Sequence, residues 1–122
     1  MTSILIVPGY QNSEAGHWQS LWESSVPGAR RVEMRSWAFP EQGEWIETLD
    51  AAIADCRTPP ILVGHSLGCI AIVLWAASHE RPIRGALLTT PADVERPDGL
   101  EGLRPFGPIP RQTLGFPAIL AA

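Results

Sequence analysis

The stretch Ile61-Leu62-Val63-Gly64-His65-Ser66-Leu67-Gly68 indicates both the fold of this chain and the residue on which its chemistry would depend. It contains the pattern G-x-S-x-G, preceded by a short apolar run and followed by an apolar run of helix length over 69–79. This context is typical of a nucleophile elbow, in which a serine on a strained turn between a strand and a helix raises its hydroxyl above the sheet edge. Gly64 and Gly68 are needed there because a Cβ at either position would clash with its crowded neighbours. The alternative interpretation is an ordinary glycine-rich turn between a strand and a helix.

Length, composition and charge limit the classes of protein to consider. The 122 residues are 45% hydrophobic and 18% charged, which fits a single globular domain over 1–122. A net charge of −4 without a Lys/Arg cluster argues against nucleic acid and against an anionic membrane surface as partners. The apolar stretch 60–77 is interrupted by glycine, histidine and serine, which favours a buried strand and helix over a membrane span. The N-terminus lacks the basic and long apolar regions of a signal peptide, so we expect a cytoplasmic protein.

Patterns for bound metals or nucleotides are missing from the sequence. Cys56 and Cys69 have neither the spacing of a metal site nor that of a disulfide framework. Neither G-x-G-x-x-G nor G-K-[ST] occurs, which argues against a nucleotide-binding protein. We therefore expect no cofactor and no metal, and we expect a monomer or a weak homodimer.

Strand-like and helix-like runs alternate along the chain. Strands are predicted over 3–7, 31–35, 61–65, 85–90 and 116–122, and helices are predicted to begin at 16 and to cover 41–56 and 69–79. Such alternation predicts a parallel sheet with helices on both faces, and right-handed crossovers give the strand order 2-1-3-4-5. The fold class is therefore α/β.

Two segments outside the elbow receive a specific interpretation. Trp18, Leu21 and Trp22 have helical spacing, so we expect them to pack in the core. The segment 91–115 loses periodicity and collects prolines and glycines after a predicted strand, at the sheet edge where sites form in open α/β sheets. We interpret it as a lid or a substrate-shaping loop within the domain, with a disordered surface loop as the alternative.

A serine hydroxyl becomes a good nucleophile only when a base takes its proton, and the oxyanion that forms needs hydrogen-bond donors. With Ser66 as nucleophile, one donor would be the backbone N–H of Leu67, the next residue. The second should come from the loop after the first strand, where Gly9 and Tyr10 stand, and we choose the Tyr10 N–H. Alternatively, Tyr10 is an ordinary turn residue, and the sequence alone supports both interpretations about equally.

The three histidines offer no convincing base. His79 is about 20 Å along the predicted helix from Ser66, where a cation at the helix C-terminus is the simpler interpretation. His65 adjoins Ser66 but should point away from it, and His17 is better explained as a loop anchor or a substrate contact. Asp93 follows a strand but has no histidine to orient. No complete catalytic triad can be assembled from these residues.

A set of residues spread over nearly the whole chain matches a known family. They are Val7-Pro8-Gly9-Tyr10, Ser13, His17-Trp18, Trp22-Glu23, Trp37, Pro40, Trp45, Gly64-His65-Ser66-Leu67-Gly68-Cys69, Trp75-Ala76, Gly85-Ala86-Leu87-Leu88 and Pro91-Ala92-Asp93-Val94-Glu95. On these residues the chain resembles the small α/β-hydrolases of the retinoblastoma-binding protein 9 type, which include bacterial serine hydrolases of unassigned substrate. Ser36 departs from the pattern, because an aspartate often precedes the tryptophan there.

The resemblance implies a three-layer α/β-hydrolase fold with Ser66 as nucleophile. It also implies a catalytic aspartate just after the strand that reaches Ala122 and a histidine further on, so that the triad would be completed beyond residue 122. We therefore expect a serine hydrolase, similar to a carboxylesterase, that lacks its C-terminal third as given and is inactive in this form. Without that third, the last strand would leave an apolar edge bare.

The predicted reaction is hydrolysis of a small ester, thioester or amide through an acyl-Ser66 intermediate. Gly9, His17, Trp18 and His65 are the candidate substrate contacts. The alternative is a non-catalytic hydrolase fold that serves protein interaction. The only near match to the motif L-x-C-x-E, residues 67–71, lacks the glutamate and falls on a predicted buried helix, which argues against that alternative.

Overall fold

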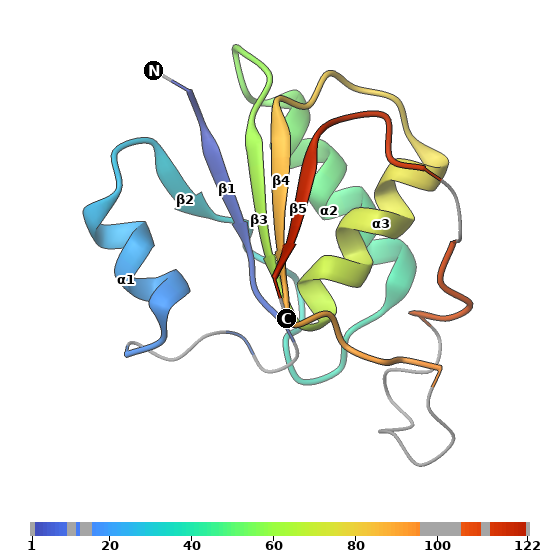
Figure 1. Cartoon of the computed structure of the whole chain (residues 1–122). Coiled ribbons are helices and arrows are strands. Elements are labelled where there is room, and N and C mark those ends of the chain that lie inside the picture. The colour runs from blue at the N-terminus through green and yellow to red at the C-terminus, as the bar shows by residue number, and fades with distance from the viewer. Residues whose placement is uncertain (1, 10–11, 13–15, 96–105, 111–112, 122) are drawn as a thin grey trace.

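The computed structural model describes residues 2–9, 12, 16–95, 106–110 and 113–121, and these residues form a parallel sheet with helices on both faces (Figure 1). Its strands are β1 (Ile4–Val7), β2 (Ala29–Arg31), β3 (Ile61–His65), β4 (Gly85–Thr89) and β5 (Ala118–Ala121). All neighbouring pairs are parallel, and the spatial order is β2-β1-β3-β4-β5. The strand order predicted from the sequence is confirmed.

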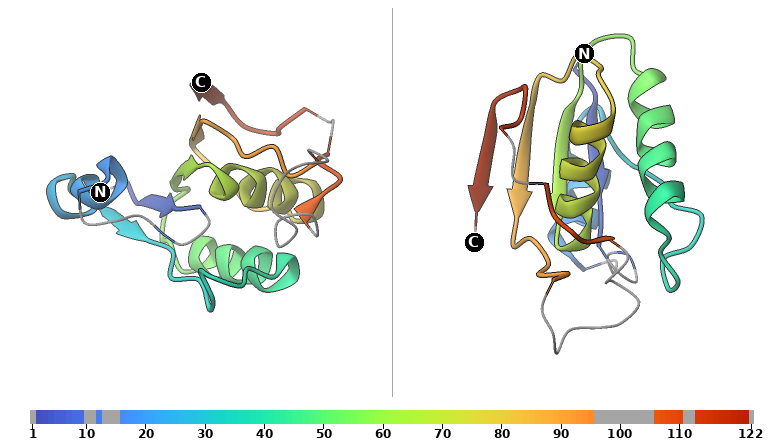
Figure 2. Two further views of the ribbon diagram at one scale, coloured as in Figure 1. Left: turned by 90° about the horizontal axis from the view of Figure 1, so that it is seen from below. Right: turned by 90° about the vertical axis from the view of Figure 1, so that its right-hand side faces the viewer.

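The helices are α1 (Trp18–Ser25), α2 (Gln42–Ala54) and α3 (Leu67–Ser78). Figures 1 and 2 show α2 and α3 on one side of the sheet and α1 on the other. Helix α2 begins where the Glu41 carboxylate accepts hydrogen bonds from the N–H groups of Gly43 and Glu44, at 3.2 and 2.9 Å. Among the described residues, no helix combines the length and the apolar character needed to cross a membrane.

The main core lies between the sheet and the two helices α2 and α3. Leu5, Leu62 and Ala86 stand side by side on β1, β3 and β4 and are buried against these helices. Helix α3 is apolar on almost every side, and seven of its residues are buried, as its sequence predicts. Its apolar stretch therefore occupies the centre of the domain, directly behind the turn that carries Ser66.

The expectation that Leu21 and Trp22 pack in the core is wrong. Their exposed fractions are 52% and 36%, whereas the polar Gln19 is fully buried. Helix α1 has only eight residues, and only its first turn contains a fully buried residue. That turn carries Gln19, whose side-chain amide donates a hydrogen bond to the carbonyl of Val63 in β3 at 3.1 Å.

The second strand begins and ends earlier than the predicted 31–35. Strand β2 covers Ala29–Arg31. Val32 still donates its N–H to the Ile6 carbonyl at 2.9 Å, but the chain then leaves the sheet. Val32 and Met34 nevertheless reach the core, with exposed fractions of 2% and 6%. The two side chains thus lie in the same core, as their spacing of two residues predicts.

The proline- and glycine-rich segment 91–115 is anchored at two described positions. Val94 is 3% exposed and Phe106 is fully buried. The ring of Phe106 packs edge-on against Trp45 of α2, with 5.5 Å between the ring centroids. Residues 96–105 and 111–112 lie outside the described residues, so the prediction of a lid or substrate-shaping loop stays a prediction.

Candidate functional site

Ser66 occupies the sharp turn between β3 and α3. Its φ of 55° and ψ of −120° lie in a region that L-residues rarely adopt, and such a conformation costs about 1–3 kcal/mol. Its N–H donates to the Thr89 carbonyl at 3.1 Å, and its own carbonyl accepts from the Cys69 N–H at 3.1 Å. Its side chain does not cap the helix. The hydroxyl is therefore held at the carboxyl end of β3 by its backbone alone.

The two glycines of the turn are needed for the close approach of α3 to the sheet. A Cβ at Gly64 would lie 2.8 Å from Ile72 Cδ1 and 3.1 Å from Cys69 Cα. A Cβ at Gly68 would collide with the carbonyl oxygen of Val7. Both positions are thus closed to any larger residue by backbone atoms or buried side chains.

Gly9 brings the loop after β1 against the Ser66 turn. A Cβ at Gly9 would lie 2.9 Å from Ser66 Cβ and 3.1 Å from the backbone nitrogen of Leu67. Leu67 is the first residue of α3, so its N–H has no carbonyl partner within the helix and lies at the positive end of the helix dipole. An oxyanion donor is therefore available beside Ser66. Tyr10, predicted to supply the second donor, lies outside the described residues.

Three of the residues predicted to contact substrate form one aromatic cluster beside the turn. The ring centroids of His17 and His65 are 4.6 Å apart, and those of Trp18 and His65 are 6.1 Å apart. Trp18 also packs edge-on against the half-exposed Trp22 at 5.2 Å. Partial burial, together with the nearby charge of His17, lowers the pKa of His65. The cluster is aromatic, and its two imidazole rings can also take part in hydrogen bonds.

His17 and His79 both act as local structural groups. His17 Nδ1 accepts from the Gln19 N–H at 3.2 Å and so caps α1, which fits a loop anchor. His79 ends α3, where its ring nitrogens lie 3.2 Å from a Glu47 carboxylate oxygen and 2.8 Å from the Ser78 hydroxyl. It stands at the far end of α3 from Ser66, about 20 Å along the helix.

No base for Ser66 can be assigned among the described residues. The ring of His65 is held by β4, since its Nδ1 lies 3.3 Å from Thr89 Oγ1 and 3.2 Å from Thr90 Oγ1. Asp93 is exposed, and its carboxylate accepts from the Glu95 N–H at 3.2 Å in a local turn. The hydrogen bonds found within the described part of the chain do not include one from Ser66 Oγ to a histidine.

One group of potential metal ligands occurs in the described residues, at the opposite end of α3. Carboxylate and imidazole atoms of Glu47, Asp50 and His79 lie within 4.8 Å of one another. Asp50, however, is engaged by Arg81 at 2.7 and 3.1 Å and by Trp75 Nε1 at 3.0 Å. These bonds lower the pKa of Asp50 to about 2. The arrangement ties α2 to α3 and is explained without a metal.

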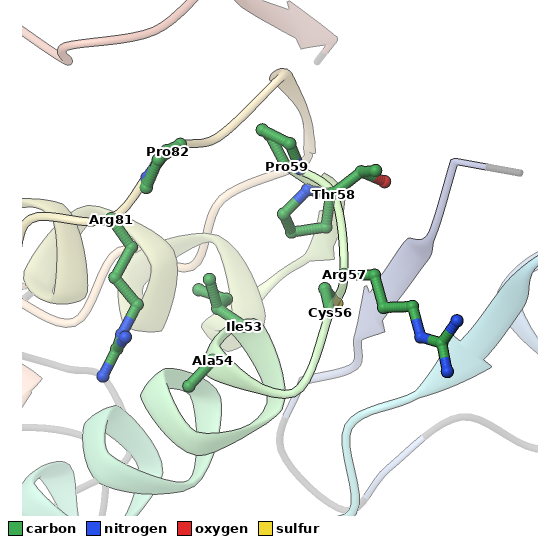
Figure 3. Close-up of a pocket in the computed structure, with 9 residues that line it drawn as sticks. Ile53, Ala54, Cys56, Arg57, Thr58, Pro59, Arg81 and Pro82 are labelled. Carbon is green, nitrogen blue, oxygen red and sulfur yellow. The ribbon is translucent and has the colours of Figure 1, made fainter.

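Two cavities in the described residues lie away from Ser66. One of about 180 Å³ is shown in Figure 3, where Arg57 extends away from Ile53 and Ala54. The other, of about 490 Å³, is bounded by residues at the end of α3 and by Phe116. Pro60 and Pro82 line the first cavity, and Pro82 also lines the second. These prolines precede β3 and β4, so both cavities lie toward the amino ends of the strands. Sites in open α/β sheets form at the carboxyl edge, where Ser66 lies.

Sequence reasoning missed Thr89 and Thr90, which contact His65 at the end of β4. A signal was available, because the carboxyl end of a strand beside the predicted elbow is where site residues gather in this architecture. Threonine is also a common strand residue, so the sequence alone does not distinguish a site hydroxyl from an ordinary strand residue at these positions.

A family model described as serine hydrolase matches residues 4–122. Similar solved structures include a protein described as a YdeN-like hydrolase from Pectobacterium atrosepticum, which is 28% identical with a TM-score of 0.82. That match covers 98% of this chain and 62% of the Pectobacterium chain. The ydeN gene product of B. subtilis is 19% identical with a TM-score of 0.65, and covers 98% of this chain and 71% of its own. No curated protein matches. The chain thus spans less than two thirds of the length of the Pectobacterium hydrolase.

Proposed function

The chain belongs to the serine hydrolase family, and we propose that Ser66 is the nucleophile of a hydrolase acting on a small ester, thioester or amide. The observation that carries this proposal is the backbone of Ser66, with φ of 55° and ψ of −120° between β3 and α3. A serine held in a strained conformation at the carboxyl edge of a parallel sheet is the geometry of a nucleophile elbow. A plain structural turn at this position would be less strained with glycine.

The proposed reaction has two steps. The Ser66 Oγ attacks the acyl carbon while a base takes its proton, and the resulting oxyanion accepts hydrogen bonds from the N–H groups of Leu67 and Tyr10. Collapse of this intermediate breaks the bond to the alcohol, thiol or amine, which leaves with the proton from the base. Water then attacks acyl-Ser66 by the same route, releasing the acid and regenerating the hydroxyl.

We propose that the base and the carboxylate that orients it come from a segment outside residues 1–122. The involvement of His17 in capping, of His65 with β4 and of His79 with Glu47 supports this proposal. The triad order Ser, Asp, His of α/β-hydrolases is compatible with it. The 122 residues alone would then have little activity. Membership of the retinoblastoma-binding protein 9 type, a finer assignment, is part of the same proposal.

We further propose that Gly9, His17, Trp18 and His65 contact the substrate. The ring contacts of the two histidines and Trp18 offer an aromatic wall beside the Ser66 turn. Such a wall favours an uncharged, apolar acyl or leaving group over a charged one.

A fluorophosphonate probe tests the proposal, because it phosphonylates serines, with loss of fluoride, only where they are activated. We expect one adduct on the full natural protein, mapped to Ser66 by peptide mass spectrometry, and its loss in Ser66→Ala. Ser24→Ala, which removes an exposed hydroxyl on α1, serves as the matched control and should keep the adduct. Full esterase activity in Ser66→Ala, or an adduct on another residue, would overturn the assignment.

The alternative of a protein-interaction module receives no support from the segment that suggested it. Residues 67–71 form the first turns of α3, and all five are buried. A partner could not reach Leu67 or Cys69 without unfolding the centre of the domain.

A further inference from the structure

The end of β4 contacts the Ser66 turn at several consecutive positions. The carbonyl of Thr89 accepts hydrogen bonds from the Ser66 N–H at 3.1 Å and from the Cys69 thiol at 3.3 Å. The hydroxyl of Thr89 donates to the Gly64 carbonyl at 2.8 Å and lies 3.3 Å from His65 Nδ1. One residue therefore touches the turn before, at and after the serine.

The Thr89 hydroxyl can donate only one hydrogen bond. A hydroxyl has a single proton, and here it is donated to the Gly64 carbonyl at the shorter distance of 2.8 Å. Toward His65 Nδ1 the same oxygen can only accept. A valine at this position has nearly the same shape but can neither donate nor accept, so the packing and the hydrogen bonds of Thr89 can be separated by experiment.

Backbone strain occurs on both sides of this contact. Thr90 has a φ of 40°, which is unusual for a β-branched residue, and Ser66 has a φ of 55°. The Thr90 hydroxyl lies 3.2 Å from His65 Nδ1, and its N–H donates to the Ala121 carbonyl of β5 at 2.8 Å. Strained residues persist only where their surroundings hold them in place.

From these contacts we propose that Thr89 is a positioning residue for the nucleophile: its hydroxyl ties Gly64 and His65 to β4 and so holds Ser66 in its strained, reactive conformation. This inference rests on the proposed function of Ser66. Thr89 acts through the turn and touches no reacting atom. Without the hydroxyl, the turn can relax, and the Ser66 Oγ moves relative to the Leu67 N–H.

The test compares Thr89→Val with Thr89→Ser in the full natural protein. The matched control is Thr58→Val, in the loop before β3, at the other end of the strands from Ser66. The readout is the rate of Ser66 modification by a fluorophosphonate, separated into the maximal rate and the half-saturating probe concentration. We expect Thr89→Val to lower the maximal rate about tenfold or more, because small displacements of reacting groups cost up to about 100-fold. The half-saturating concentration should stay unchanged, and Thr89→Ser and Thr58→Val should remain within about twofold of the wild type.

The outcomes separate this inference from the proposed function. A folded wild-type protein that is not modified at Ser66 overturns both. Modification of wild type and Thr89→Val at equal maximal rates overturns the positioning role alone, and so does a Thr89→Ser variant as slow as Thr89→Val. If Thr89→Val does not fold, as judged by its thermal unfolding, the comparison of Thr89→Ala with Thr89→Ser applies the same criterion.

Discussion

Two glycines, one in the β3–α3 turn and one in the loop after β1, are packed so closely that an added Cβ would clash with a neighbour. Gly68 faces the carbonyl of Val7, and Gly9 faces Ser66 and the Leu67 nitrogen. Neither glycine is needed for a left-handed backbone, since among the described glycines only Gly28 has a positive φ. Their role is to let α3 and the loop after β1 meet at the point where Ser66 lies.

We predict that Gly68→Ala destabilises the fold. The added methyl must push β1 and α3 apart, and such overpacking costs about 1–3 kcal/mol or more. Gly16→Ala is the matched control, because a Cβ at Gly16 meets nothing within 4 Å. Urea unfolding of both variants checks the prediction. Equal midpoints for Gly68→Ala and Gly16→Ala would show that the helix can shift without cost.

The strain at Ser66 predicts a stability difference between two inactive variants. Ser66→Gly and Ser66→Ala both remove the hydroxyl, but only glycine adopts the observed φ of 55° and ψ of −120° readily. We expect Ser66→Gly to be more stable than Ser66→Ala by about 1 kcal/mol or more. The comparison is made by chemical unfolding under identical conditions. A more stable Ser66→Ala would indicate that the turn is not strained in solution.

The helices are attached to the sheet by polar contacts as well as by the core. Helix α1 presents Gln19 to β3, while Arg31 of β2 pairs with Glu23 of α1 at 3.0 Å and donates to Asn12 at 2.8 Å. Helices α2 and α3 are joined by Asp50, which Trp75 and Arg81 both contact. Hydropathy patterns do not reveal such contacts, because each joins a polar side chain to a different segment of the chain.

For α1 we predict that the buried polar residue Gln19 contributes more to the stability of the fold than the exposed apolar residue Leu21. Gln19→Ala removes a buried side chain and its hydrogen bond to Val63, which should cost about 1–3 kcal/mol. Leu21→Ala on the same helix should change the free energy of unfolding by only about 0.5 kcal/mol, since Leu21 is 52% exposed. Equilibrium unfolding of the two variants provides the measurement. The reverse ranking would place α1 in a different orientation on the sheet.

The contact of Asp50 in α2 with Trp75 and Arg81 predicts that the stability of the fold depends on pH. The bonds from Arg81 and Trp75 lower the pKa of Asp50 from 3.8 to about 2 in the folded state. Since the folded pKa is the lower one, the stabilisation is complete above about pH 4 and is lost as the pH falls toward 2. Wild type should therefore exceed Asp50→Asn in stability at neutral pH, and the difference should shrink over this acid range. In an Arg81→Gln background, the effect of Asp50→Asn on stability at neutral pH should be smaller. A stability difference between wild type and Asp50→Asn that is the same at pH 2 as at neutral pH would contradict the lowered pKa of Asp50.

Taken as a whole, the described molecule has one well-covered sheet face and one exposed edge. The residues of β5 are all exposed, and Ile119 and Leu120 are each 68% exposed. Strand β5 lies at the edge of the sheet, beside β4 (Figure 2). Strand β5 pairs with β4 on one side only among the described strands. An exposed apolar edge strand offers unpaired backbone groups to another chain.

We predict that a protein of residues 1–122 associates weakly with itself through β5. Sedimentation velocity should show a weight-average sedimentation coefficient that increases with protein concentration, and Ile119→Lys should reduce this increase. Phe39→Lys is the control, because Phe39 is 84% exposed and lies outside the sheet. Association that responds to Phe39→Lys and not to Ile119→Lys would place the contact elsewhere.

The sequence by itself determined the elements and their order, because these depend on local properties. The apolar run before Gly64, the apolar run after Gly68 and the amphipathic stretch of α2 each restrict the backbone within a few residues. Right-handed crossovers then leave few arrangements of parallel strands. The glycines at 64 and 68 could be predicted from the G-x-S-x-G pattern, but the atom that a Cβ at Gly68 would meet, the Val7 carbonyl oxygen, lies in β1 and is identified only by the tertiary structure.

Only the tertiary structure decided which side chains meet at the turn. The contact of Thr89 with Gly64 and His65, the approach of Gly9 to Leu67 and the inward position of Gln19 join segments that are 20 or more residues apart. Such contacts depend on the relative placement of whole elements, which periodicity does not encode. A helix of eight residues on one part of a sheet can bury Gln19 and expose Leu21, because packing geometry outweighs hydrophobicity there.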